Sequence, residues 1–410
     1  MLVWSLISAA FIGPGTVTIA LAAGSGYQFS LLWALVFSVI GCFILQEGAG
    51  RVTISSGKPL GKAIAEVFAN QPLVPLLIAL AVVTGCVAYE AGNLIGANAG
   101  LKLLHAPGYV FYLSLIIAAM LLIAGQIKIL TILLSILVAV MGVVFLVVAF
   151  QIPWSGTQIV AGLMPSVPDT GMLLVSGLVG TTIVPYNLFL GSGIGQVAGQ
   201  NLKLMHIGLV LAVFGGGLIT MAILVVGSLL SGTWDFYTVK MLLNETVGSF
   251  AAWMFSVGLF AAGLTSAITA PLAAQFTLQS LFPRRSGLTR FTGVLVLLVG
   301  FLFQVFALEP IPLIIAAQAF NGILLPFSAV SVLLILNDKK VLPAKNLNNL
   351  PANFLGLLVT GITIYLGLLG ILKIPSGYFS WSVGNIAGWL MELSLMLMIV
   401  LAWWIYKKRR

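Results

Sequence analysis

Charged residues are scarce in this sequence: Asp, Glu, Lys and Arg make up 7% of the 410 residues, against about 25% in soluble domains. Hydrophobic residues instead make up 60%, and the mean hydropathy is +1.17. A chain with so few charged side chains does not have enough of them to cover the water-exposed surface of a soluble domain. The composition therefore excludes a soluble domain and indicates a membrane protein.

Cysteine and histidine are also rare, with two of each. Cys42 and Cys86 fall inside apolar runs without a partner at a useful spacing, so we interpret them as small buried hydrophobic residues. His105 and His206 lie at the ends of such runs. There is no phosphate-binding loop, which argues against a pump driven by ATP. We expect neither an enzyme nor a bound cofactor, and no confident metal ligand.

Apolar runs long enough to cross a bilayer recur along the whole chain. No basic region precedes the first run and no small-residue cleavage site follows it, so it is a span and not a signal peptide. The chain is predicted to be one polytopic all-α integral membrane domain, residues 1–410. The twelve predicted spans are 2–25, 31–50, 74–98, 109–125, 129–150, 171–195, 207–231, 249–277, 291–308, 311–335, 353–373 and 384–406.

The net charge of +9 is distributed unevenly over the connections between these spans. With the N-terminus in the cytoplasm, only Lys102, Lys240 and Lys373 of the 18 Lys and Arg residues lie outside. This bias predicts a multi-pass protein of the plasma (inner) membrane with both termini cytoplasmic. The same bias accounts for the excess of basic residues, because they orient the protein in the membrane. We therefore expect the lipid bilayer as a partner and do not expect binding to nucleic acid.

Two spans are interrupted near their centres by proline and glycine. Pro14 lies in "FIGPGTVTIALAAGSG" of span one, and Pro185 lies in "SGLVGTTIVPYNLFLGSG" of span six. These are corresponding places in two five-span halves, about 1–150 and 171–335, with two extra helices over 353–406. Such pairing is typical of inverted-repeat secondary transporters whose substrate site lies between two broken helices.

The predicted breaks offer backbone groups of both kinds. The N–H groups of Gly15 and Thr16 begin a half-helix and suit a carboxylate. The carbonyl groups from Ala10 to Gly13 end the preceding half and suit a cation. Span six supplies a similar set from Thr181 to Tyr186.

The segments around both breaks resemble the Nramp family of proton-coupled divalent-metal transporters. "GPGT…AAGSGYQFSLLW", "LQEGAGRVTISSGKPLGKA", "VPYNLFLGS", "AAGLTSAITAPLAAQ" and "AAQAFNGILLPF" are similar to family segments in the same order, over nearly the whole chain. The resemblance implies a LeuT-type fold in which helices 1–5 and 6–10 form the inverted repeat and helices 1 and 6 are broken.

The sequence departs from the family where the family binds metal. The resemblance puts the family's aspartate on Gly13, its asparagine on Thr16 and its methionine on Val184. Its two span-six histidines fall on Tyr186 and Gly191. Of that set, a glutamine alone is retained, as Gln318, together with carbonyl groups near Ala10 and Thr181.

Because a dehydrated divalent ion needs compensating negative charge, we predict a different substrate. The expected substrate is a small organic solute with a carboxylate, such as an amino acid or 5-oxoproline, taken up by ion-coupled secondary transport. The predicted substrate-binding residues are Ala10, Gly13, Gly15, Thr16, Thr181, Val184, Tyr186, Asn187 and Gln318. One alternative is a transporter of Mg²⁺ or Mn²⁺ through carbonyl groups and Gln318; another is a non-transporting receptor or scaffold.

Glu90 is an acidic residue in the middle of an apolar span, where a carboxylate is costly. By the resemblance, the family's proton-pathway aspartate falls on Glu90, and Asn93 stands where the family has a second acidic residue. Arg290 resembles the arginine that completes this proton pathway. We therefore predict coupling to protons, the alternative being a permanently neutral Glu90 bonded to Tyr89 or Asn93. Sodium is the rival coupling ion, through Thr265 and Ser266.

The other acidic residues have structural interpretations. Glu47 precedes Arg51 by four residues, which predicts an ion pair on one helix. Asp235, Glu245 and Asp338 are expected in loops, and Glu392 on a peripheral last helix. The sequence does not indicate an oligomeric state and is compatible with a monomer.

Overall fold

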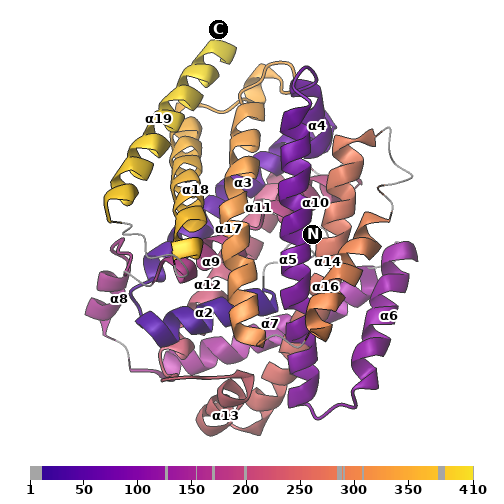
Figure 1. Ribbon diagram of the computed structural model, residues 1–410, viewed down its shortest axis with the longest axis vertical. Coiled ribbons are helices and arrows are strands. Elements are labelled where there is room, and N and C mark those ends of the chain that lie inside the picture. Colours follow the sequence, from indigo (N-terminus) through magenta and orange to yellow (C-terminus); the bar gives the residue numbers. More distant parts are fainter. Residues whose placement is uncertain are drawn as a thin grey trace.

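The computed structural model describes residues 12–124, 128–153, 155–168, 171–197, 201–283, 289, 291–306, 309–376 and 384–409. Every regular element in these ranges is a helix, and most helices run side by side in a single bundle (Figure 1). The prediction of an all-α membrane protein is confirmed.

The long apolar helices correspond to the predicted spans. In the described ranges, nine helical segments are long and apolar enough to cross a membrane, and α6 and α16 are shorter apolar helices. With α2, which is the described part of span one, they account for the twelve predicted runs. Their bounds are α2 Pro14–Tyr27, α3 Leu32–Ser56, α5 Leu73–Leu103, α6 Tyr109–Ala124, α7 Lys128–Gln151, α9 Met172–Thr182, α10 Pro185–Val197, α11 Leu202–Leu209, η1 Val210–Phe214, α12 Gly215–Gly227, α14 Ser249–Leu281, α16 Thr292–Val305, α17 Pro310–Ile335, α18 Leu350–Ser376 and α19 Gly384–Arg409.

Four short helical segments connect the long helices. They are α4 Leu60–Val67, α8 Gly156–Gly162, α13 Phe236–Val247 and the 3₁₀ turn η3 Ala344–Asn346. Figure 1 shows α4 and the end of α19 at one end of the bundle and α13 at the other. The two ends correspond to the two faces of a membrane.

Close helix crossings at glycine hold the centre of the bundle together. The long helices α5 and α14 pack against each other extensively. A methyl group in place of hydrogen at Gly263 of α14 would lie 2.5 Å from the Ala97 nitrogen of α5. Small residues at such crossings let helix backbones approach within van der Waals contact, which is the main attraction between helices in lipid.

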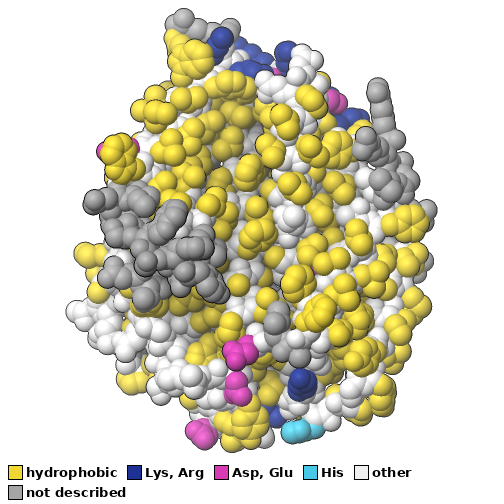
Figure 2. Space-filling view, in the orientation of Figure 1, with side chains coloured by type: hydrophobic (Ala, Val, Ile, Leu, Met, Phe, Trp, Pro, Cys, Tyr) yellow, Lys and Arg dark blue, Asp and Glu magenta, His cyan; other side chains and the backbone are white. Residues whose placement is uncertain are grey.

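The outside of the bundle is apolar, as the hydrophobic side chains covering the face in Figure 2 show. Helix α19 is the most peripheral of the predicted spans, with 17% of its apolar window buried. Its outward residues include Trp389, Ile399 and Trp403. This surface suits lipid chains, and Glu392 is on this peripheral helix as predicted.

The sequence-based bounds and loops need two corrections. Helices α3 and α5 extend beyond their predicted spans, because a helix continues past the hydrocarbon layer where its residues allow it. Glu245 is not in a loop but lies on α13, whereas Asp235 precedes this helix, as predicted, and caps it. Asp338 follows α17 in a turn, as predicted; its side chain is 1% exposed and forms an ion pair with Lys408.

Candidate functional site

The first break is well defined on its C-terminal side. Gly13 has an extended backbone (φ −99°, ψ 176°), and α2 begins at Pro14. Proline suits the first position of a helix because it has no N–H to leave unpaired there. Its ring packs against Gly96 of α5, where any side chain would overlap it. The chain therefore turns into α2 at the predicted place.

The second break separates α9 from α10. Helix α9 ends at Thr182, Ile183 leaves the helical conformation (φ −96°, ψ 75°), and α10 begins at Pro185. The end of α9 is pressed against α17, since a methyl group at Gly180 would overlap the Gln318 carbonyl oxygen. The second interruption is therefore a real break between two helices, and at the first the described chain begins a helix at Pro14 after an extended Gly13.

The two breaks are in direct contact. The hydroxyl oxygens of Thr16 on α2 and Thr181 on α9 are 3.0 Å apart and share a hydrogen bond. Both side chains are buried. Gly15 on α2 lies against Gln318 of α17, so that a methyl group at Gly15 would overlap the Gln318 amide nitrogen. The structure thus brings Gly15, Thr16, Thr181 and Gln318 together, as predicted.

Gln318 and Asn187 carry polar atoms without partners. Gln318 is fully buried, and neither its amide oxygen nor its amide nitrogen makes a hydrogen bond within the described residues. The Asn187 amide oxygen on α10 is in the same condition, on a side chain that is 2% exposed. Unpaired buried amides cost about 1–3 kcal/mol each. Groups in this state are available to a substrate.

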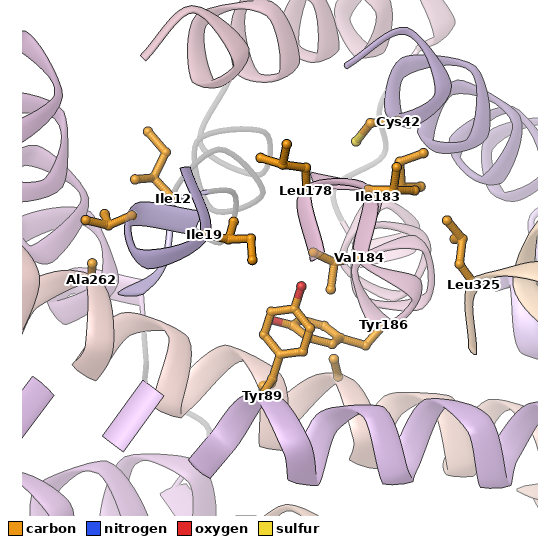
Figure 3. Packing of buried hydrophobic residues seen from close by; sticks show 14 of the residues in the cluster. Ile12, Ile19, Cys42, Tyr89, Leu178, Ile183, Val184, Tyr186, Ala262 and Leu325 are labelled. Atoms are coloured by element: carbon orange, nitrogen blue, oxygen red, sulfur yellow. The ribbon is translucent and has the colours of Figure 1, made fainter. Parts of the chain in front are cut away.

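Tyrosines close the space between α5 and the second break. The Tyr89 hydroxyl donates to the Gly180 carbonyl (2.6 Å), and the ring of Tyr89 meets that of Tyr186 edge-on at 5.3 Å. Figure 3 shows the two rings together, next to Val184. Val184 belongs to the hydrophobic core and is 2% exposed. Nothing in the sequence indicated the Tyr89–Gly180 bond; the alternative considered for Glu90 named Tyr89 or Asn93 as its partner.

Ser266 and Asn93 lie around Gly13. A methyl group at Gly13 would be 3.1 Å from the Ser266 hydroxyl oxygen and 3.8 Å from the Asn93 amide oxygen. Thr265, the other residue of the predicted sodium site, donates its hydroxyl to the Ala261 carbonyl of its own helix (2.7 Å). Ser266 thus faces the first break, and the Thr265 hydroxyl hydrogen is engaged within α14.

Glu90 is enclosed between α5 and α16. Its side chain is fully buried, and a methyl group at Gly300 of α16 would overlap its Cγ atom. In the part of the chain that is described, neither carboxyl oxygen meets a hydrogen-bond partner. Asn93 follows one helical turn later, between Glu90 and Gly13. Ala10 and Arg290, which the sequence assigned to the site and to the proton network, lie outside the described residues.

Any cation at the breaks would meet uncharged ligands. The described residues contain no group of three or more His, Cys, Asp or Glu side chains that could hold a metal. The donors available are amide oxygens, hydroxyl groups and the last carbonyl groups of α9, which lack partners inside their helix. Oxygen donors of this type suit the hard cations Mg²⁺, Ca²⁺ and Mn²⁺ better than softer transition metals.

Comparison with known proteins identifies the relatives of this chain. A sequence model of the family described as "Natural resistance-associated macrophage protein-like" (Nramp) matches residues 5–373. A divalent metal cation transporter MntH of Verminephrobacter eiseniae is 27% identical over 296 residues, covering 67% of this chain and 66% of that protein. An MntH of Pediococcus pentosaceus is 26% identical over 380 residues, covering 82% and 83%.

A solved structure shares the fold. The crystal structure of a manganese transporter mutant of Eremococcus coleocola superposes with a TM-score of 0.71 at 19% identity, over 99% of this chain and 93% of that one. At this identity the likeness shows the fold, and it confirms the predicted LeuT-type arrangement.

These relatives contradict the predicted organic substrate. They are named divalent metal cation or manganese transporters, which favours the alternative of a divalent cation over a carboxylate-bearing solute. The prediction gave decisive weight to the missing aspartate and methionine. It also expected the N–H groups of Gly15 and Thr16 to meet a carboxylate, whereas the Gln318 amide packs directly on Gly15.

Proposed function

Because this chain belongs to the Nramp family, we propose that it is a secondary-active transporter of a hard divalent cation, Mg²⁺ or Mn²⁺. Gln318 is the observation that carries the proposal. Its side chain is fully buried beside Gly15, where α2 begins, and both ends of its amide lack a protein partner. An oxygen donor held at the break between half-helices is what a cation passing through this fold requires.

The absence of a carboxylate sets how the ion is bound. A bare divalent ion surrounded by neutral groups in a low-dielectric site is strongly destabilised. Mg²⁺ gives up its water reluctantly and is commonly held with several waters in place. We infer that the cation keeps part of its water shell, and that Gln318, Asn187 and the carbonyl groups at the end of α9 supply the remaining contacts. Such a site binds weakly and releases readily.

We propose protons as the coupling ion, with Glu90 as the proton carrier. The Glu90 carboxyl group is fully buried, with the Asn93 side chain as its polar neighbour. An ionised carboxylate is expensive in such an enclosed place, so the charge on this residue depends on its surroundings. Asn93 lies one turn away and near Gly13, which connects Glu90 to the cation site through a polar side chain. A movement at the first break can therefore change the environment of the carboxyl group.

We also propose that the protein lies in the plasma membrane with both termini in the cytoplasm. The basic residues near α4, after α17 and at the end of α19 support this orientation. Protease accessibility of a C-terminal tag in intact and in permeabilised cells tests it. Cleavage of the tag in intact cells would show that the C-terminus lies outside and would contradict the proposed orientation.

Uptake into proteoliposomes tests the substrate. We expect uptake of Mg²⁺ or Mn²⁺ that is stimulated by an inwardly directed proton gradient. Gln318→Leu removes the amide and should lower uptake by about tenfold, the equivalent of about 1.4 kcal/mol of lost binding. Gln318→Glu adds a carboxylate of the same shape and should tighten cation binding.

Ser331→Ala is the matched control on the same helix. Its hydroxyl donates to the Phe327 carbonyl (2.6 Å) within α17, so its removal should leave uptake unchanged. Thermal unfolding gives a second measurement, since a cation at about a hundred times its dissociation constant stabilises the folded state by about 2.7 kcal/mol. If neither cation is transported or shifts the melting temperature, the proposal is wrong.

A further inference from the structure

The C-terminal end of α19 is fastened to the turn that follows α17. The Lys408 ammonium group forms an ion pair with buried Asp338, at 2.5 Å. The Arg409 Nε donates to the Asn337 amide oxygen (2.9 Å), and the Lys339 ammonium donates to the Arg409 carbonyl. These contacts hold the last helical turn of α19 in a defined place.

The connection between α17 and α18 returns to the same place. The Asn348 backbone N–H donates to the Leu336 carbonyl at the end of α17 (3.1 Å). This brings η3, with Lys345, back toward the turn after α17. Asn337 and Asn353 exchange side-chain hydrogen bonds of 2.8 and 2.9 Å, which ties α18 to the same turn.

Four lysines without an acidic partner lie where the end of α19 meets the turn after α17 and η3. Lys339, Lys340, Lys345 and Lys407 are exposed, and within the described ranges none of them forms an ion pair with an acidic side chain. The acidic side chains near this corner already have basic partners: Asp338 is paired with Lys408, and Glu47 is paired with Arg51, which also bonds Asn346 and Asn348. We call these four lysines the basic rim. Figure 2 shows Lys and Arg side chains gathered at the end of the molecule where α19 ends.

The basic rim lies at the boundary between lipid and water. Trp403, on the last turns of α19, is 59% exposed, and the Lys407 ammonium lies 5.3 Å from the centre of its ring. Tryptophan is enriched at the membrane interface, at the level of the lipid headgroups. Of the nine long apolar segments in the described ranges, α19 has the least buried apolar window, at 17%, so most of this helix faces away from the bundle.

We propose that the basic rim binds the headgroup phosphates of anionic phospholipids in the adjoining leaflet. Clusters of four or more basic residues directly after a membrane helix attract anionic lipids. The orientation of the protein in the membrane requires basic residues on one side, but it does not require that side-chain contacts hold them together at one place. The buried Asp338–Lys408 pair presents the rim in a fixed arrangement, so little ordering is needed when a lipid binds. This inference is independent of the transported substrate.

Lipid titration of the detergent-solubilised protein tests the proposal. The probes are dioctanoyl phosphatidylglycerol, dioctanoyl phosphatidylcholine of equal chain length, and glycerol 3-phosphate, with the dissociation constant as the readout. We expect the anionic lipid to bind more tightly than both others. Each lysine near the surface contributes about 1 kcal/mol, or roughly fivefold, so Lys340→Gln with Lys407→Gln should reduce the preference by about 25-fold.

Lys62→Gln with Lys203→Gln is the matched control. It also removes two exposed lysine charges from the chain, but outside the rim. It should leave the preference for the anionic lipid unchanged, whereas high salt should abolish that preference in the wild type. Equal binding of the two lipids would overturn the proposal. So would an equal loss in both double variants, or binding of glycerol 3-phosphate as tight as that of the anionic lipid.

Discussion

The hydroxyl oxygens of Thr16 and Thr181 lie 3.0 Å apart, although the two residues are 165 positions apart in the chain. One begins the helix after the first break and the other ends the helix before the second. Their hydrogen bond therefore joins the two inverted halves of the bundle at the place where both backbones are interrupted.

Removing one of these hydroxyl groups should impair transport. A buried hydrogen bond contributes about 0.5–1.5 kcal/mol, so Thr16→Ala or Thr181→Ala should lower the rate of cation uptake by about two- to tenfold. Initial uptake rates measure this effect. Thr16→Ser keeps the hydroxyl and should retain most activity. If the double alanine variant loses the full sum of both single effects, the two hydroxyls act independently and the bond has no functional role.

Gly13→Asp should strengthen cation binding. The Gly13 backbone is extended, which every residue tolerates, and a Cβ atom requires a shift of a few tenths of an ångström at the Ser266 hydroxyl. A carboxylate there supplies the missing negative charge, and we expect the dissociation constant for Mn²⁺ to fall by about tenfold or more. Gly13→Asn has the same shape without the charge. A weaker affinity in the aspartate variant than in the asparagine variant would contradict the cation site.

Glu90→Gln should separate transport from the proton gradient. The amide fits the space beside Gly300 but carries no titratable proton, so cation uptake should continue down its own gradient and lose its response to pH. The measurement is uptake with and without an inwardly directed proton gradient. Glu392→Gln on the peripheral helix α19 is the control. An undiminished pH response in Glu90→Gln would show that another group, or sodium, couples transport.

We expect the local stability of α13 to depend on pH through its capping residue, Asp235. This helix lies at the opposite end of the bundle from α4. The Thr238 backbone N–H donates to its carboxylate (2.7 Å) and lowers the pKa of Asp235 below its usual value of 3.8. A lowered folded-state pKa stabilises the folded α13 above the unfolded value, and this contribution is lost as the pH falls through the folded value. Replacing such a cap by alanine costs about 1 kcal/mol of helix stability.

Hydrogen exchange of the α13 amides measures this cap directly. We expect Asp235→Ala to speed exchange at neutral pH, whereas exchange in the wild type should show extra opening only at acidic pH, below the usual carboxyl range. Asp235→Asn keeps a capping oxygen without the charge and should show no such acid-dependent step. An identical acid response in Asp235→Asn would exclude the carboxylate as its origin.

The predictions that rest on local chemistry hold in the structure. Pro14 and Pro185 each begin a helix at the predicted break, because proline restricts its own backbone and lacks an N–H wherever it stands. The Glu47–Arg51 pair forms at 3.0 Å, since residues four apart on a helix lie on one face. Contacts between distant segments were not predicted from the sequence: the Tyr89 hydroxyl donates to the Gly180 carbonyl, and Asp338 is buried in an ion pair with Lys408.

The amino-acid sequence by itself determined the membrane class, the helical spans and the two breaks, because hydrophobicity and backbone preference act over a few neighbouring residues. The tertiary structure alone decided what faces each break. The family resemblance had placed Gly15 and Gln318 in one site, but the direct packing of the Gln318 amide on Gly15 depends on glycines at the crossings that let α2, α9 and α17 approach closely. The substrate prediction, which was drawn from the missing aspartate and methionine, is contradicted by relatives that are named divalent metal cation transporters.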